Sequence, residues 1–98
     1  MSHRFLLSPA AQRDVQQIWD YTADRWGMDQ AGHYLRELQQ AIERAAVNPL
    51  IGRSCEEVRP GYRKLPAGSH VVFYRQTDDG AIDVVRILHQ RMDIDRHL

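Results

Sequence analysis

The chain has a single cysteine, a single lysine and no net charge, and each shortage argues against a class of protein. One thiol, Cys55, cannot form an internal disulfide or a paired-thiol metal site, so we expect a reducing compartment. Thirteen basic residues are balanced by thirteen acidic ones, whereas nonspecific nucleic-acid binders carry a basic excess. The composition therefore disfavours direct nucleic-acid binding by this chain alone.

Long apolar runs and glycine-rich loops are also missing. No apolar run approaches the roughly 20 residues of a membrane-spanning helix, and Met1–Arg4 leads into a strand-like segment without a signal-peptide core. We therefore expect a cytoplasmic protein with no membrane association. Because no phosphate-binding glycine loop is present, a nucleotide enzyme is disfavoured and no cofactor is expected.

What the chain does have is the composition of an ordinary folded domain. It contains 98 residues, of which 43% are hydrophobic and 27% are charged. A chain of this length buries roughly 60 to 65% of its unfolded surface, which is enough for one core. We therefore expect a single domain that spans residues 1–98.

The first half predicts two helices. Ser8 is a good N-cap and Pro9 suits the first helical position, and Gly27 ends the apolar periodicity that begins there. Asp29 is expected to cap a second helix that closes at Asn48. A link of about three residues makes the helices antiparallel neighbours. The apolar stripe of the first helix contains Ala11, Val15, Ile18, Trp19, Thr22 and Trp26, and its polar side contains Arg13, Asp14, Gln17, Asp20 and Asp24.

Short strands are expected around and after the helices. They cover Arg4–Leu7, Tyr62–Leu65, His70–Arg75 and Ala81–His89, with a hairpin turn at 77–80. The element order is therefore β-α-α-β-β-β, an α+β fold with a helical hairpin on a small sheet. Strict alternation in the last strand puts Ile82, Val84, Arg86 and Leu88 on one face. Arg86 must then reach an edge or meet a carboxylate.

Two groups of side chains resemble catalytic or metal sites only weakly. The densest imidazole and carboxylate group is His89, Asp93, Asp95 and His97, whose spacing matches no metal signature, so no metal is expected. The run Gly68–His70 is the only candidate for a serine nucleophile beside a histidine. It lies at a hairpin entry rather than a strand-to-helix elbow, which favours a turn serine and a strand histidine.

Basic and aromatic side chains are the more informative candidates. The basic residues on or beside the expected sheet are Arg59, Arg63, Lys64, Arg75, Arg86 and Arg91, with His70 and His89. On the first helix, Trp19 and Trp26 lie close to two turns apart. Core packing is the default interpretation of this pair. An exposed stripe would instead form a groove for an amphipathic partner helix.

Eight short segments together carry a family resemblance over nearly the whole chain. They are Leu7–Ala11, Ile18–Tyr21, Trp26–Gly27, Asn48–Pro49, Ile51–Arg53, Arg59–Arg63, Ser69–Arg75 and Val85–Asp93. In their order and spacing the chain resembles the ParE toxins of the RelE/ParE superfamily. This resemblance implies a helical hairpin packed on a small, twisted, mainly antiparallel sheet.

The resemblance also implies partners. ParE toxins are encoded with a ParD-type antitoxin, which folds over the toxin in a hetero-oligomer and binds the operator DNA. As a family they poison DNA gyrase. We therefore expect a non-enzymatic toxin that stabilises the DNA-cleaved state of gyrase by binding it preferentially. The expected gyrase contacts are Arg63, Arg86, His89 and Arg91, and the expected antitoxin contacts are Trp19, Trp26 and Tyr34.

Two alternatives stay open. The RelE branch of the superfamily cleaves mRNA on the ribosome with strand-borne basic residues and a C-terminal aromatic. The comparable positions here fall at Gly61, Arg63, His70 and Arg91, and no aromatic follows Tyr74, which weakens this alternative. His89 remains a potential acid or base. The other alternative is a non-toxic interaction or regulatory module with the same fold.

Overall fold

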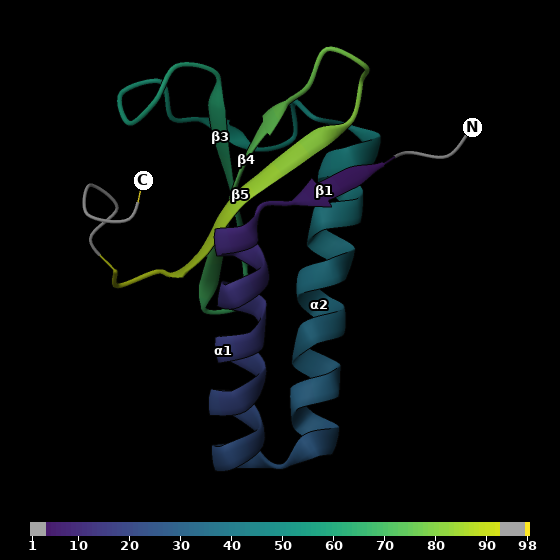
Figure 1. Cartoon of the computed structure of the whole chain (residues 1–98), viewed down its shortest axis with the longest axis vertical. Helices are drawn as coiled ribbons and strands as arrows, with labels where there is room; N and C mark the ends of the chain where they lie inside the picture. The colour runs from purple at the N-terminus through teal and green to yellow at the C-terminus, as the bar shows by residue number, and fades with distance from the viewer. Residues whose placement is uncertain (1–3, 93–97) are drawn as a thin grey trace.

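A helical hairpin covers one face of a five-stranded mixed sheet in the computed structural model, which describes residues 4–92 and 98 (Figure 1). The elements are β1 (Phe5–Leu7), α1 (Pro9–Trp26), α2 (Met28–Val47), β2 (Arg53–Ser54), β3 (Tyr62–Ala67), β4 (His70–Gln76) and β5 (Ile82–His89). The predicted order and fold class are confirmed, with β2 as an additional short strand. Neither helix in this part of the chain has the length and apolar content needed to cross a membrane.

The sheet is antiparallel except at one edge. Its strand order is β1-β5-β4-β3-β2, and β1 runs parallel to β5 with Phe5 opposite Ile82 and Leu7 opposite Val84. The last bond of this edge runs from the Ser8 amide to the Val84 carbonyl at 3.0 Å, and α1 begins at the next residue, Pro9. β1 therefore covers only the first part of the outer edge of β5.

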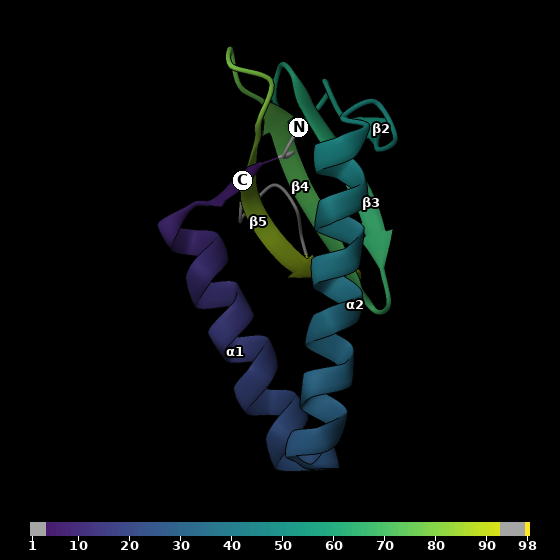
Figure 2. The same cartoon turned by 90° about the vertical axis from the view of Figure 1, so that its right-hand side faces the viewer.

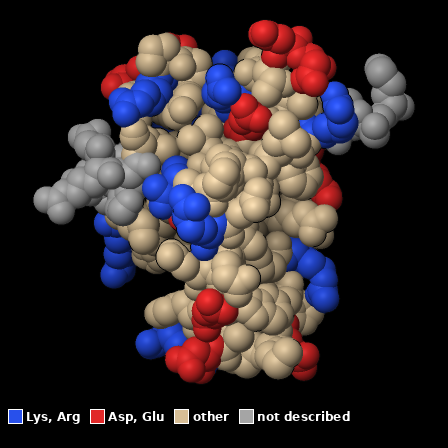
Figure 3. Space-filling view, viewed as in Figure 1, with Lys and Arg blue, Asp and Glu red and all other residues tan. Residues whose placement is uncertain are grey.

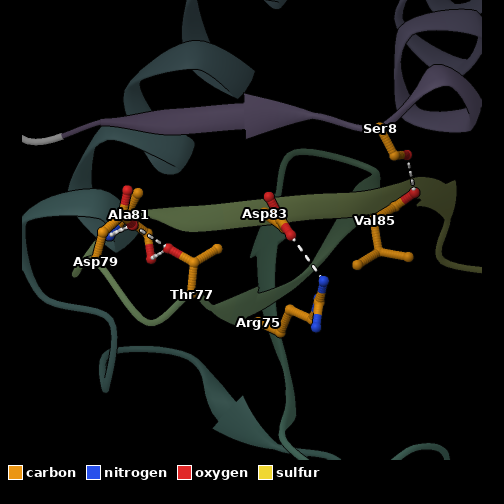
Figure 4. Close-up of polar contacts among 7 residues, drawn as sticks. All are labelled: Ser8, Arg75, Thr77, Asp79, Ala81, Asp83 and Val85. Atoms are coloured by element: carbon orange, nitrogen blue, oxygen red, sulfur yellow. Dashed lines mark hydrogen bonds and ion pairs between the residues drawn. The ribbon is translucent and has the colours of Figure 1, made fainter.

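Ser8 fixes the start of α1 against the sheet. Its hydroxyl oxygen accepts a hydrogen bond from the Ala11 amide at 3.0 Å, as the predicted N-cap requires. The same hydroxyl donates to the carbonyl of Val85 on β5 at 2.7 Å (Figure 4). One side chain thus caps the helix and attaches it to the strand.

The two helices are joined by Gly27 alone, which is shorter than the predicted link of about three residues. Gly27 has a φ of 92° and serves as the C-cap of α1 and the N-cap of α2. The prediction that Asp29 caps α2 is wrong, because the helix already begins at Met28 and places Asp29 in its first turn. Figures 1 and 2 show that the hairpin extends past the sheet and that the helices separate toward it.

A β-bulge interrupts the alternation of β5. Phe73 on β4 pairs with Arg86, but the next residue, Tyr74, pairs with Val84, so Val85 has no partner. The predicted placement of Arg86 and Leu88 on the same face as Ile82 and Val84 is therefore wrong beyond Val84. The residues of β5 that join the main core are Ile82, Val84 and Ile87, whereas Leu88 joins a second cluster.

Two hydrophobic cores flank the sheet. The main core lies between the hairpin and the sheet and includes Ala11, Ile18, Leu38, Ala41, Ile42, Ala45, Ala46, Val72, Tyr74, Ile82, Val84 and Ile87. Val72 and Tyr74 belong to this core, so the intervening Phe73 points to the opposite face. There it packs with Cys55 and Leu88 under Val58, Tyr62 and Leu98. Burial raises the pKa of the Cys55 thiol, which is a free cysteine.

Tyr74 ties the segment after α2 to the sheet. Its hydroxyl donates to the Pro49 carbonyl at 2.7 Å and accepts from the Gly52 amide at 2.9 Å. A Cβ atom at Gly52 would lie 2.5 Å from this hydroxyl oxygen and 2.9 Å from the Lys64 carbonyl. The close approach therefore requires glycine at position 52.

Candidate binding groove

Asp14 and Arg86 form an ion pair between α1 and β5. Arg86 donates from Nε to Oδ2 and from Nη2 to Oδ1 of Asp14, both at 2.8 Å, and the Ile87 amide donates to Oδ2 at 2.9 Å. The predicted position of Asp14 on the polar side of α1 is wrong, because its side chain is only 7% exposed. Of the two alternatives for Arg86, the structure has the carboxylate partner.

This arrangement follows from the short length of β1. In the part of the chain that the structure describes, no strand lies on the outer edge of β5 beyond Val84, so the Ile87 amide needs another acceptor. α1 runs past this edge and Asp14 supplies that acceptor. The ion pair is bidentate, and the hydrogen bonds from Arg86 to Asp14 raise the pKa of the guanidinium.

Tyr34 joins α2 to the turn between β3 and β4. Its hydroxyl accepts from the Ser69 amide at 2.9 Å and lies 2.5 Å from Nδ1 of His70. Gly68 has a φ of 59°, and a Cβ atom there would lie 2.6 Å from Cε1 of Tyr34. The Gly68–His70 run is thus a tight turn packed under a tyrosine ring, which agrees with a turn serine and a strand histidine.

His70 and His89 are direct partners across β4 and β5. Their rings make an edge-to-face contact with centroids 5.4 Å apart. Burial and the neighbouring His89 lower the pKa of His70, and Asp14 opposes this effect. At neutral pH His70 is therefore uncharged.

A groove runs from this histidine pair along α1 and α2, between the helical hairpin and the ends of β4 and β5. It consists of two adjoining cavities of about 390 and 520 Å³, which share Tyr21, Thr22, His70 and His89. We call it the hairpin groove. The remaining lining residues are Asp14, Gln17, Ile18, Ile87 and Met92 in the first cavity and Trp26, Gln30, Tyr34 and Ser69 in the second.

The rim of the hairpin groove is aromatic. Trp26 is 67% exposed and Tyr21 is 62% exposed, and the guanidinium of Arg25 stacks on the Tyr21 ring at 5.3 Å. The core-packing interpretation is therefore wrong for Trp26. Figure 3 shows charges of both signs at the sheet end and at the hairpin tip of the face in view. Large exposed aromatic side chains beside a groove are typical of protein interfaces.

The four expected gyrase contacts do not form one cluster. Arg63 lies on β3, where Nη1 donates to the Gly52 carbonyl at 2.8 Å. It is paired with Tyr74 near one end of the sheet, whereas His89 is paired with His70 at the other end. Arg91 is exposed, and its amide donates to Nδ1 of His89 at 3.2 Å. His89 and Arg91 therefore lie together at the end of β5, and Arg86 reaches the hairpin groove region through Asp14, whereas Arg63 lies apart from it.

Other basic residues of the sheet have acidic partners. Arg75 binds Asp83 on the adjacent strand at 3.0 Å (Figure 4), and Arg4 binds Asp79 at 2.9 Å. Both pairs are largely exposed and contribute little stability. They reduce the net positive charge that the basic residues of the sheet carry.

Of the expected antitoxin contacts, Trp26 and Tyr34 line the hairpin groove and Trp19 does not. Trp19 is half-buried on α1. Sequence reasoning missed Tyr21, Met92 and the contribution of Thr22 to the groove wall. The four-residue spacing of Tyr21 and Arg25 is a signal for the first of these, because such pairs meet on a helix surface.

The weak metal candidate falls largely outside the described residues. His89 lies in the hairpin groove, but Asp93, Asp95 and His97 are not among the residues that the structure describes. Within residues 4–92 and 98, no three histidine, cysteine or acidic side chains are close enough together to hold a metal ion.

Known proteins are similar to this chain in fold and in sequence. A family model described as "ParE toxin of type II toxin-antitoxin system, parDE" matches residues 5–94. The chain belongs to the ParE toxin family. It is 70% identical to Toxin ParE1 of Mycobacterium tuberculosis over the full length of both chains. It is also 45% identical to Toxin ParE1 of Caulobacter vibrioides, over 96% of each chain.

Solved structures confirm the RelE/ParE-like fold. A chain of the chromosomal ParDE system of P. aeruginosa superposes with a TM-score of 0.75, covering 90% of this chain and 98% of that one, at 21% identity. A chain of the RelBE2 toxin-antitoxin complex of Mycobacterium tuberculosis gives a TM-score of 0.63, covering 92% and 100%, at 15% identity. Membership of the ParE family makes this chain a toxin of a type II toxin-antitoxin system, and such systems imply an antitoxin partner.

Proposed function

We propose that this ParE-family toxin acts by binding rather than by catalysis. It holds DNA gyrase in its DNA-cleaved complex and is neutralised by a ParD-type antitoxin. The observation that carries the proposal is the exposed aromatic rim of the hairpin groove, where Trp26 and Tyr21 are 67% and 62% exposed. Free surface of this kind suits a protein partner better than a small substrate.

The antitoxin is proposed to cover the hairpin groove with an amphipathic segment. Trp26 and Tyr34 would anchor this segment, with Tyr21 beside them and Trp19 at the margin. Such a segment would remove the exposed apolar area from water, which is the main source of affinity in helix-in-groove recognition. The free toxin is then less soluble than its complex.

The gyrase contact is proposed to lie at the end of β5, where His89 and Arg91 are neighbours. Arg86 and Arg63 stay in the proposed contact set. Arg86 also binds Asp14, and Arg63 also binds the Gly52 carbonyl. Replacing either one would therefore alter the fold as well as the contact. His89 and Arg91 are the better positions for a test.

Purified gyrase provides the test of the proposed target. Supercoiling and DNA-cleavage assays are run with the toxin alone, with the toxin and antitoxin, and with R91A and H89Q. We expect cleaved DNA to accumulate with the toxin and to disappear when the antitoxin is added. R91A should weaken poisoning, whereas R25Q, an exposed arginine at the hairpin tip, serves as the matched control. Unchanged gyrase activity at saturating toxin contradicts the proposal.

A RelE-like ribonuclease is the second candidate, and the Tyr34, His70 and His89 arrangement is the observation that favours it. Tyrosine and histidine side chains in a groove are groups that can transfer protons. A ribosome-dependent mRNA cleavage assay beside the gyrase assay separates the two. Cut mRNA with unaffected gyrase supports the ribonuclease, and neither activity supports a non-toxic interaction module.

A further inference from the structure

The hydrogen bonds of the histidine pair indicate which ring nitrogens carry a proton. The Tyr34 hydroxyl accepts the Ser69 amide proton, and among the described residues its own proton has Nδ1 of His70, at 2.5 Å, as the acceptor within reach, so we assign the hydroxyl proton to this contact. Nδ1 of His89 accepts the Arg91 amide proton at 3.2 Å. Both Nδ1 atoms are therefore acceptors, and in the neutral rings both Nε2 atoms carry the proton.

As far as residues 4–92 line it, the hairpin groove thus holds two N–H donors and no uncommitted carboxylate. Among the described residues Asp14 is the only acidic one in the lining, and both of its oxygens are occupied by Arg86 and the Ile87 amide. The other walls are mostly aromatic or aliphatic. The neutral side chains of Gln17, Thr22, Gln30 and Ser69 carry acceptor oxygens, but the negative charge that would pair with the two N–H donors is left for a ligand to supply.

The same tautomers disfavour a metal ion. A metal bound at Nε2 needs the ring proton on Nδ1. In His89 that proton would face the Arg91 amide, which is itself a donor. The Nδ1 proton of His89 and the Arg91 amide proton would then face each other without an acceptor. The histidine pair is therefore suited to an acceptor group rather than to a cation.

We propose that Nε2 of His70 and Nε2 of His89 together bind a carboxylate, the side chain of an Asp or Glu within an apolar segment of a partner protein. The site deepens the proposed function, because the antitoxin segment proposed to fill the hairpin groove would carry this acidic residue. The aromatic rim binds the apolar residues of the segment, and the histidine pair fixes its register.

Proton uptake accompanies this binding. The titratable and charged groups around His70 are Asp14, Tyr21, Tyr34, His89 and Arg86, and Asp14 is already neutralised by Arg86. Burial and His89 hold the pKa of His70 low in the free protein, and a bound carboxylate opposes both effects. Binding therefore strengthens as the pH falls toward the ordinary pKa of histidine.

NMR titration of the free toxin tests the site without any partner protein. The ring nitrogens of His70 and His89 are followed while 4-phenylbutyrate or its neutral isostere 4-phenylbutyramide is added. We expect the carboxylate to bind about tenfold more tightly than the amide, because a hydrogen bond to a charged group is worth about 1.5 kcal/mol or more. The preference should grow as the pH is lowered from 8 to 6.

Three variants complete the experiment. H89Q leaves the Tyr34–His70 contact intact and should abolish the preference for the carboxylate, as should H70Q. H33Q removes an exposed imidazole on α2 outside the hairpin groove and should behave as the wild type. Equal binding of acid and amide, or a preference that survives in a folded H89Q, overturns the histidine pair as a carboxylate site.

Antitoxin peptides then test the occupant. Overlapping peptides of the antitoxin that restores growth are measured with each Asp or Glu in turn replaced by Asn or Gln. We expect one acidic position to matter about tenfold for the wild type and not at all for H89Q. Equal affinities for every replacement overturn the antitoxin segment as the occupant. Poisoning of gyrase by the wild-type toxin alone fails or succeeds independently of either result.

Discussion

Asp14 reaches from α1 to the edge of β5 and holds Arg86 through two hydrogen bonds of 2.8 Å. A third bond, from the Ile87 amide at 2.9 Å, places the same carboxylate in the backbone pairing of the sheet. Helix and strand are thereby fixed to each other at one point. That point also forms the end wall of the hairpin groove.

Replacing Asp14 by Asn should destabilise the protein. D14N removes the Asp14 charge beside Arg86, whose side chain is only 21% exposed. We expect a loss of about 2 to 3 kcal/mol in the free energy of unfolding, somewhat less than for a fully buried pair. Urea denaturation measures it. D20N, an exposed position on the same helix, should change stability by less than about 0.5 kcal/mol, and an equal effect of both variants contradicts the role of Asp14.

Gly52→Ala and Gly32→Ala should shift the melting temperature in opposite directions. A Cβ atom at Gly52 meets the Tyr74 hydroxyl at 2.5 Å, and overpacking of this kind costs about 1 to 3 kcal/mol. At Gly32 on α2 the nearest atom would be 3.8 Å away, so the gain in helix propensity of about 0.5 to 1 kcal/mol remains. Calorimetry reads both changes. A stabilised G52A would contradict this prediction, because it would show that Tyr74 can move away from the new methyl group with no loss of stability.

Stability should fall as the pH drops below about 6.5, the ordinary pKa of histidine. The pKa of His70 is lowered in the folded state, mainly by burial, so the unfolded chain takes up the proton first. The stabilising effect is complete above the unfolded pKa and is lost as the pH falls through the folded one. The free energy of unfolding, measured with urea between pH 5 and 8, should change less with pH in H70Q than in H33Q. An identical pH dependence of the two variants contradicts the assignment.

Trp26→Ala should weaken the antitoxin complex with little effect on folding. Trp26 is 67% exposed, so we expect less than about 0.5 kcal/mol of lost stability. An interface tryptophan typically contributes about 2 kcal/mol or more to binding. Titration calorimetry with the antitoxin measures the loss. M28A, at an equally exposed neighbour outside the lining of the hairpin groove, is the control, and similar losses for both would place the interface elsewhere.

Most of the fold could be predicted because it depends on local signals. Ser8 and Pro9 mark the start of α1, and the turn at 77–80 marks the hairpin between β4 and β5. The short strand β2 carries no such signal, because its two exposed residues, Arg53 and Ser54, have no apolar alternation. It forms by pairing with β3, which is a tertiary effect.

The hairpin groove was harder to predict because it depends on two irregularities. The bulge at Val85 changes the face on which Ile87 and Leu88 lie, and no residue type at that position announces it. Asp14 is a polar residue that helical periodicity alone places toward solvent. Its burial depends on Arg86 and Ile87 of β5, which lie 72 and 73 residues away in the sequence. The sequence identified Trp26, Tyr34 and His89 individually. That they line one groove follows from the packing of the hairpin on the sheet, which the sequence does not specify locally.

Asp14 also bears on how the toxin behaves at high concentration. Open strand edges invite neighbouring chains to extend a sheet, which is a common route to aggregation. An incoming strand that sought the Ile87 amide would have to expel Asp14 and leave Arg86 without that partner. Self-association along this edge would cost an ion pair and is therefore opposed. This cost protects the protein from aggregation, which its exposed aromatic groove otherwise favours.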